Sequence, residues 1–88
     1  MFDIEFTAKA EKQLYKLEKD IQIRIISALE RIRIRPLSYV KKLVSSPYFR
    51  LKVSKYRVIL DIRNDKLIIY VIELGHRRNI YKETKGIS

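Results

Sequence analysis

Five side chains in the C-terminal half of the chain have the types and spacing that phosphate chemistry needs. Arg50 and Lys52 are two residues apart in an alternating stretch, so a strand would turn both toward one face. Arg57 follows a short turn, and Arg77 and Tyr81 lie near the C-terminus. Guanidinium groups bind phosphate oxygens through paired donors, and an aromatic ring can stack on a nucleobase. These residues could therefore form a site for a polyanionic partner, with nucleic acid among the candidates.

The reaction that such a site could catalyse is cleavage of RNA by its own 2′-hydroxyl group. The protein must align this nucleophile, accept its proton and stabilise the negative charge that builds on the phosphate. Arg57 and Arg77 could clamp the phosphate, and a cluster of cations needs no metal for this task. Positive neighbours favour the neutral amine of Lys52, which makes it a candidate base. The expected products are a 2′,3′-cyclic phosphate and a 5′-hydroxyl.

Each of these residues also has a purely structural interpretation. Alternating cations on a strand are most often solvent-facing, and Arg57 could pair with Asp61. His76 could be a strand-end residue that is hydrogen-bonded to the backbone, and we favour this role over a catalytic one. Tyr81 could pack its ring as the anchor of the C-terminal tail. The site interpretation depends on these residues occurring together.

The composition favours a polyanionic partner. Twenty Lys and Arg against ten Asp and Glu give a net charge of +10 and an isoelectric point of about 10.0. There is no Cys and only one His, so disulfides and Cys nucleophiles are excluded, and we expect neither a metal nor a cofactor. No apolar run approaches the roughly 20 residues of a membrane span, and residues 1–10 do not resemble a signal peptide. We therefore expect a cytoplasmic protein that does not contact membranes.

The first half of the chain predicts one strand followed by two helices. Residues 1–6 alternate between apolar and acidic side chains, as in a half-buried strand. Thr7 is the expected N-cap of a short amphipathic helix that extends to Leu17. A second apolar stripe runs from Ile21 until just before Pro36. Residues 37–47 form a connector, in which residues 39–44 could make a helical turn.

The second half predicts three strands in an antiparallel meander. Alternation runs through residues 48–54 and 56–63, and Asn64-Asp65 is a plausible two-residue turn. Residues 67–74 are apolar on both faces, as in a central strand. The predicted fold is α+β with the order β-α-α-β-β-β and two N-terminal helices packed on one face of the sheet. We expect one domain, residues 1–88, in which residues 81–88 form a loosely ordered tail.

Two segments carry a resemblance to a known family. Residues 48–60, YFRLKVSKYRVIL, and residues 73–81, ELGHRRNIY, together resemble the RelE/ParE toxin superfamily, across about residues 1–82. The basic strand pair and the terminal Tyr are most similar to its RelE branch. The resemblance implies a microbial-ribonuclease-like fold. It assigns the active site to Arg50, Lys52, Arg57, Arg77 and Tyr81.

The same resemblance implies the toxin of a type II toxin–antitoxin system. Such a toxin would be a metal-independent, ribosome-dependent endoribonuclease that cleaves mRNA in the ribosomal A site and inhibits translation. Its partner would be a small, acidic, RelB-like antitoxin. The best-known members have Lys where this chain has Arg50, and arginine is not deprotonated in proteins. The base would then be Lys52, His76 or Tyr81.

Two other functions fit the same residues. A ParE-like toxin shares the fold, inhibits DNA gyrase and needs none of the ribonuclease residues, whereas this sequence retains Lys52, Arg57, Arg77 and Tyr81. A non-catalytic nucleic-acid-binding module would use the same cations only to contact phosphates.

Overall fold

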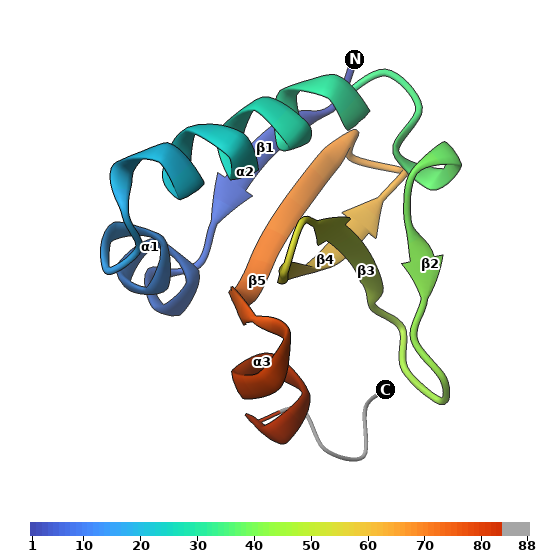
Figure 1. Ribbon diagram of the computed structural model, residues 1–88. Helices are drawn as coiled ribbons and strands as arrows, with labels where there is room; N and C mark the ends of the chain where they lie inside the picture. Colours follow the sequence, from blue (N-terminus) through green and yellow to red (C-terminus); the bar gives the residue numbers. More distant parts are fainter. Residues whose placement is uncertain (84–88) are drawn as a thin grey trace.

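The computed structural model describes the backbone of residues 1–83 and the side chains of residues 1–80 (Figure 1). The elements, in chain order, are β1 (Asp3–Phe6), α1 (Ala8–Tyr15), α2 (Lys19–Ile32), the 3₁₀ turn η1 (Pro36–Ser38), β2 (Lys41–Lys42), β3 (Phe49–Val53), β4 (Tyr56–Arg63), β5 (Ile68–His76) and α3 (Arg77–Glu83). The predicted α+β class is confirmed.

The five strands form one mixed sheet with the order β1-β5-β4-β3-β2. The pairs β2–β3, β3–β4 and β4–β5 are antiparallel. The pair β1–β5 is parallel, with Asp3 opposite Ile68 and Phe6 opposite Val71. The prediction of a wholly antiparallel sheet was therefore wrong in this respect. Alternation of side chains identifies a strand and its faces but carries no information about the direction of its neighbour.

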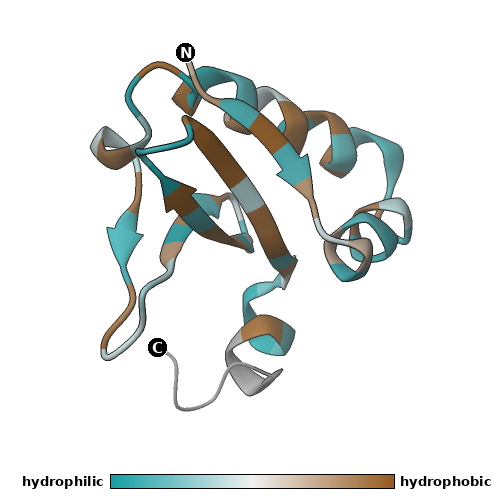
Figure 2. Cartoon of the chain, turned by 180° about the vertical axis from the view of Figure 1, so that it is seen from behind, coloured by the Kyte–Doolittle hydropathy of each residue, from teal (hydrophilic) through white to brown (hydrophobic). Residues whose placement is uncertain are grey.

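Helices α1 and α2 cover one face of the sheet and bury the main core against it (Figure 1). Thr7 caps α1 as predicted, because its hydroxyl accepts a hydrogen bond from the Ala10 N–H at 3.2 Å. The same hydroxyl donates to the Ile72 carbonyl at 3.0 Å and so fastens the helix to β5. The apolar stripe of α2 is buried at Ile25 and Leu29. In Figure 2, β5 is coloured hydrophobic over most of its length, as expected for a strand covered on both faces.

The opposite face carries a smaller core formed by Leu43, Ile59 and Ile80, with Tyr48 packed against it. Ile80 belongs to α3, a helix that we did not predict from the sequence. The Ile80 side chain is buried, with 1% of its surface exposed, and therefore anchors this helix to the sheet. The backbone of residues 81–83 continues α3, so the helix reaches into the predicted tail, whose remaining residues lie outside the described part of the chain.

Two local predictions were wrong. The helical turn expected at residues 39–44 is replaced by η1 and by the two-residue strand β2, which pairs with the edge of β3. The connection between β4 and β5 spans residues 64–67 rather than a two-residue turn at Asn64-Asp65. The positive φ in this connection, 53°, falls at Leu67. Within the described residues, no helix has both the length and the apolar character to cross a membrane.

Candidate active site

Four cations line a concavity of about 220 Å³ on the sheet face opposite α1 and α2. They are Lys41, Arg50, Lys52 and Arg57, and Tyr39 completes the lining. Cross-strand pairing produces this grouping, because Lys41 lies opposite Arg50 and Lys52 lies opposite Arg57. Residues opposite each other in an antiparallel pair point to the same face, with Cβ atoms about 5 Å apart. The predicted residues Arg50, Lys52 and Arg57 are therefore together.

Arg57 is held in place by the turn that precedes it. Only 7% of its surface is exposed, and its Nη1 atom donates to the carbonyls of Ser54 at 3.1 Å and Tyr56 at 3.0 Å. The alternative pairing with Asp61 is not formed, because the partner of Asp61 is Arg63 at 2.9 Å. The hydrogen bond from Arg63 to Asp61 raises the pKa of Arg63 above its usual value. The guanidinium group of Arg57 therefore lines the concavity in a fixed position.

The β3–β4 turn also connects Arg57 to the start of α3. The backbone N–H of Arg77 donates to the Lys55 carbonyl at 2.8 Å, next to the Ser54 carbonyl that binds Arg57. Ser54 adopts a φ of 55°, as tight turns require. Arg77 itself is exposed and does not line the concavity. Tyr81 follows it by one helical turn in α3, and its side chain lies outside the described residues.

His76 lies on the other face of the sheet. It pairs with Tyr56, and their rings meet edge to face with centroids 5.6 Å apart, whereas the partner of Arg57 is Gly75. The Nδ1 atom of His76 accepts a hydrogen bond from the Arg78 N–H at 3.2 Å at the start of α3. This arrangement fits the structural role that we favoured, and it places His76 on the face opposite Arg57.

Gly75 leaves open space beside Arg57. A Cβ atom built at Gly75 would have no heavy atom of the described residues within 4 Å, and cross-strand pairing directs it toward the face of Arg57. A phosphate could approach the buried guanidinium from this side. Gly75 was not among the predicted site residues, although its place directly before His76 was part of the sequence motif.

Sequence reasoning also missed Tyr39 and Lys41. Both lie in the connector, where a strand of two residues is too short to produce a periodic pattern. Only the pairing of β2 with β3 brings Lys41 beside Arg50. Among the described residues, no three His, Cys, Asp or Glu side chains form a group that could hold a metal ion.

A family model described as the ParE toxin of the type II toxin–antitoxin system, parDE, matches residues 4–81. The chain belongs to this toxin family. The match covers every strand of the sheet and both helices on its main face, which confirms the predicted RelE/ParE superfamily. No curated protein matches the sequence in a direct comparison.

Solved structures show that the toxin has the RelE fold. The toxin–antitoxin complex RelBE2 from Mycobacterium tuberculosis contains a chain that superposes with a TM-score of 0.80 at 23% identity, covering 86% of this chain and 98% of that chain. The isolated RelE toxin of E. coli gives 0.76 at 23% identity and covers 96% and 95%. The RelB–RelE complex from Methanococcus jannaschii gives 0.69 at 24% identity and covers 88% and 94%.

Proposed function

We propose that this type II toxin is a metal-independent endoribonuclease that cleaves mRNA in the ribosomal A site and thereby inhibits translation. The observation that carries the proposal is the concavity lined by Lys41, Arg50, Lys52 and Arg57. Four converging cations match the negative charge that a phosphodiester gains in the transition state. The volume of the concavity, about 220 Å³, suits one phosphate and its neighbouring sugar rather than a broad surface.

In the proposed reaction the 2′-oxygen attacks the adjacent phosphorus, and the bond from phosphorus to the 5′-oxygen breaks. Arg57, with its guanidinium fixed by two carbonyls, stabilises the equatorial oxygens together with Arg50. Lys52 or Tyr81 accepts the proton of the 2′-hydroxyl, and the departing 5′-oxygen takes up a proton from water. Arg77, tied through its backbone to the turn beside Arg57, binds a phosphate at the mouth of the site.

The proposed partner is a small, acidic, RelB-like antitoxin. Support comes from the similar folds in the complexes of M. tuberculosis and M. jannaschii, which contain a toxin with its antitoxin. The charge of +10 would attract an acidic chain over a long range. Such a partner would silence the toxin by covering the cationic concavity, and both would act in the cytoplasm.

A second candidate function is inhibition of DNA gyrase. The observation in its favour is the family model, which describes ParE rather than RelE toxins. Pulse-labelling after induction separates the two functions. Incorporation of amino acids should fall before incorporation of thymidine if the toxin cleaves mRNA, and the reverse order would replace our proposal with the gyrase function.

The direct test is cleavage of a transcript on programmed ribosomes. Arg57→Ala should reduce the rate by about 10²–10³-fold, the usual cost of removing one transition-state donor. Arg63→Ala is the matched control, because it removes the same charge from the same strand outside the concavity. Equal rates for the two folded variants would refute the site. Binding of RNA without cleavage by the unaltered chain would support the non-catalytic module instead.

A further inference from the structure

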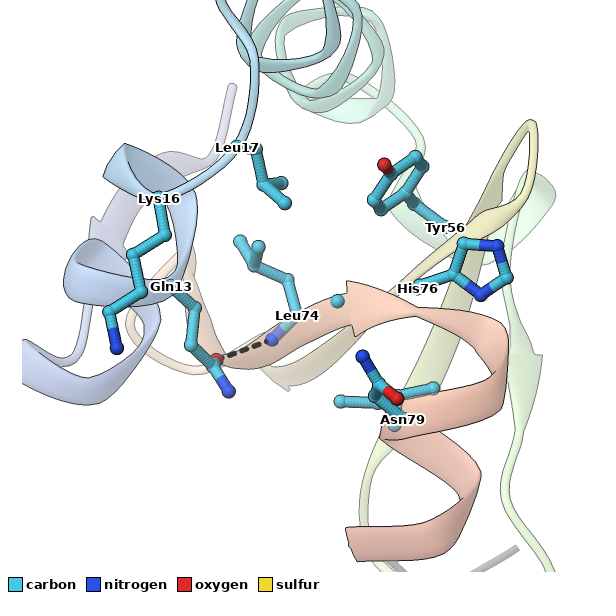
Figure 3. Close-up of a pocket in the computed structure, with 9 residues that line it drawn as sticks. Gln13, Lys16, Leu17, Tyr56, Leu74, His76 and Asn79 are labelled. Carbon is cyan, nitrogen blue, oxygen red and sulfur yellow. Dashed lines mark hydrogen bonds between the residues drawn. The ribbon is translucent and has the colours of Figure 1, made fainter.

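A second cleft of about 310 Å³ lies at the end of β5, between α1 and α3 (Figure 3). It exists because β1 ends at Phe6, opposite Val71, whereas β5 continues to His76. Helix α1 takes over this open edge, where the Gln13 side-chain oxygen accepts a hydrogen bond from the Leu74 N–H at 2.8 Å. This hydrogen bond fixes α1 against β5 at one wall of the cleft, and Lys16 and Leu17 from the α1–α2 connection extend that wall.

The walls of the cleft combine apolar, aromatic and amide groups. Figure 3 shows Leu17 and Leu74 on one side and the rings of Tyr56 and His76 on the other. The two rings are fixed by their edge-to-face contact, with an interplanar angle of 73°, and His76 is further held by the Arg78 N–H. The exposed side chain of Asn79 adds both a donor and an acceptor at the rim.

A row of lysines continues from the cleft along α1. Lys9, Lys12 and Lys16 lie three and four residues apart, so they share one helix face, where a groove of about 440 Å³ adjoins the cleft at Gln13 and Lys16. Lys9 pairs with the buried carboxylate of Glu73. Lys12 and Lys16 form no ion pair among the side chains that the structure describes, and no carboxylate lines either hollow there.

We propose that this cleft and the lysine row form a second binding site, for single-stranded RNA. One base enters the cleft against Tyr56 and His76, and the backbone phosphates that follow it bind Lys16 and Lys12. Single-strand sites elsewhere combine these elements, a positive track for phosphates and aromatic rings for bases. An acidic peptide would match the lysines, but its carboxylates would gain nothing from the rings of Tyr56 and His76, on which a base can stack.

The cleft is distinct from the concavity of Arg57, because the two share no lining residue among those that the structure describes, and His76 lies on the sheet face opposite Arg57. Its function therefore does not depend on the ribonuclease proposal. A transcript or structured RNA bound at both faces would be held at two points, which would raise its effective affinity.

The test uses a fluorescent 2′-O-methyl oligonucleotide, which lacks the nucleophile for cleavage, and the full chain carrying Arg50→Ala and Lys52→Ala to weaken the other face. In this background Lys12→Ala with Lys16→Ala should lower the slope of log K against log salt by about 1.4, or roughly 0.7 for each phosphate that the protein no longer neutralises. Arg31→Ala with Lys66→Ala removes the same charge from exposed positions outside both hollows and should leave the slope unchanged.

A second arm separates recognition of a base from simple attraction of charge. Asn79→Ala should weaken the oligonucleotide about two- to tenfold, the value of one hydrogen bond, and should leave binding of inorganic polyphosphate unchanged. Equal slopes for the lysine pair and its control pair would overturn the proposal. It would also be overturned if polyglutamate bound through Lys12 and Lys16 while the oligonucleotide did not, since the surface would then be a protein dock.

Discussion

Replacement of Gly75 by alanine should raise the stability of the toxin and lower its activity. Glycine within a strand costs about 0.5–1 kcal/mol relative to alanine because it loses more backbone freedom on folding. The new methyl group would meet no heavy atom within 4 Å in the part of the chain that the structure describes, so no clash with it offsets this gain. For a domain of this size the expected rise in melting temperature is about 2–8 °C.

The same methyl group would occupy the space from which a phosphate approaches Arg57, its cross-strand partner. A displacement of the substrate by about 1 Å can cost on the order of 10²-fold in rate, so we expect Gly75→Ala to slow cleavage by this order and Gly75→Val to slow it further. The assays are thermal unfolding followed by circular dichroism and transcript cleavage on programmed ribosomes. A variant that melts at a lower temperature would show that the space is filled. A stabilised variant with full activity would show that the substrate does not use it.

Three further perturbations test the elements that support the site. Ile80→Ala should release α3 from the sheet, because a helix of this length is not stable without its buried side chain. Hydrogen exchange should then show that the amides of α3 lose protection while those of β5 keep it. Unchanged protection in α3 would contradict this expectation. Lys9→Ala should destabilise the fold by about 1–3 kcal/mol, since Glu73 already has one buried oxygen without a hydrogen-bond partner among the described residues. The denaturation midpoint of Lys9→Ala should fall below that of Lys12→Ala. Coincident midpoints would argue against a stabilising ion pair between Lys9 and Glu73. Thr7→Ala loses a helix cap and its bond to Ile72, at a cost of about 1–2 kcal/mol in urea unfolding, and a loss smaller than about 0.5 kcal/mol would show that water replaces both.

Features that depend on neighbouring residues could be predicted from the sequence. The period of two in β3 places Arg50 and Lys52 on one face, and the hydroxyl of Thr7 directly before an apolar stripe marks the start of α1. Both signals are local, because they arise from the backbone geometry of consecutive residues. The family resemblance could be recognised for a related reason, since each of its two motifs is a short continuous stretch of the sequence.

Which residues meet across the strands was decided by the tertiary structure. Arg57 lies opposite Gly75 and His76 lies opposite Tyr56, and this register sends His76 away from the cations, although it is adjacent to Arg77 in the sequence. The irregular pairing between Ile59 and Leu60 shifts the register along β4 and β5, and a shift of one residue moves every side chain to the other face. The alternation of side chains along each strand would be the same in either register, so the sequence of one strand could not predict which residues lie opposite each other.

The cationic concavity shows the same division between local and long-range information. The charge of the chain and its toxin family follow from the sequence alone, and a short alternating stretch marks the strand that carries Arg50 and Lys52. Lys41 reaches the site only because β2 adds to the sheet edge, and β1 pairs with β5, a strand from the other end of the sequence. Burial of their apolar faces stabilises these long-range pairings, and it depends on the whole packed core rather than on the pattern of any one segment.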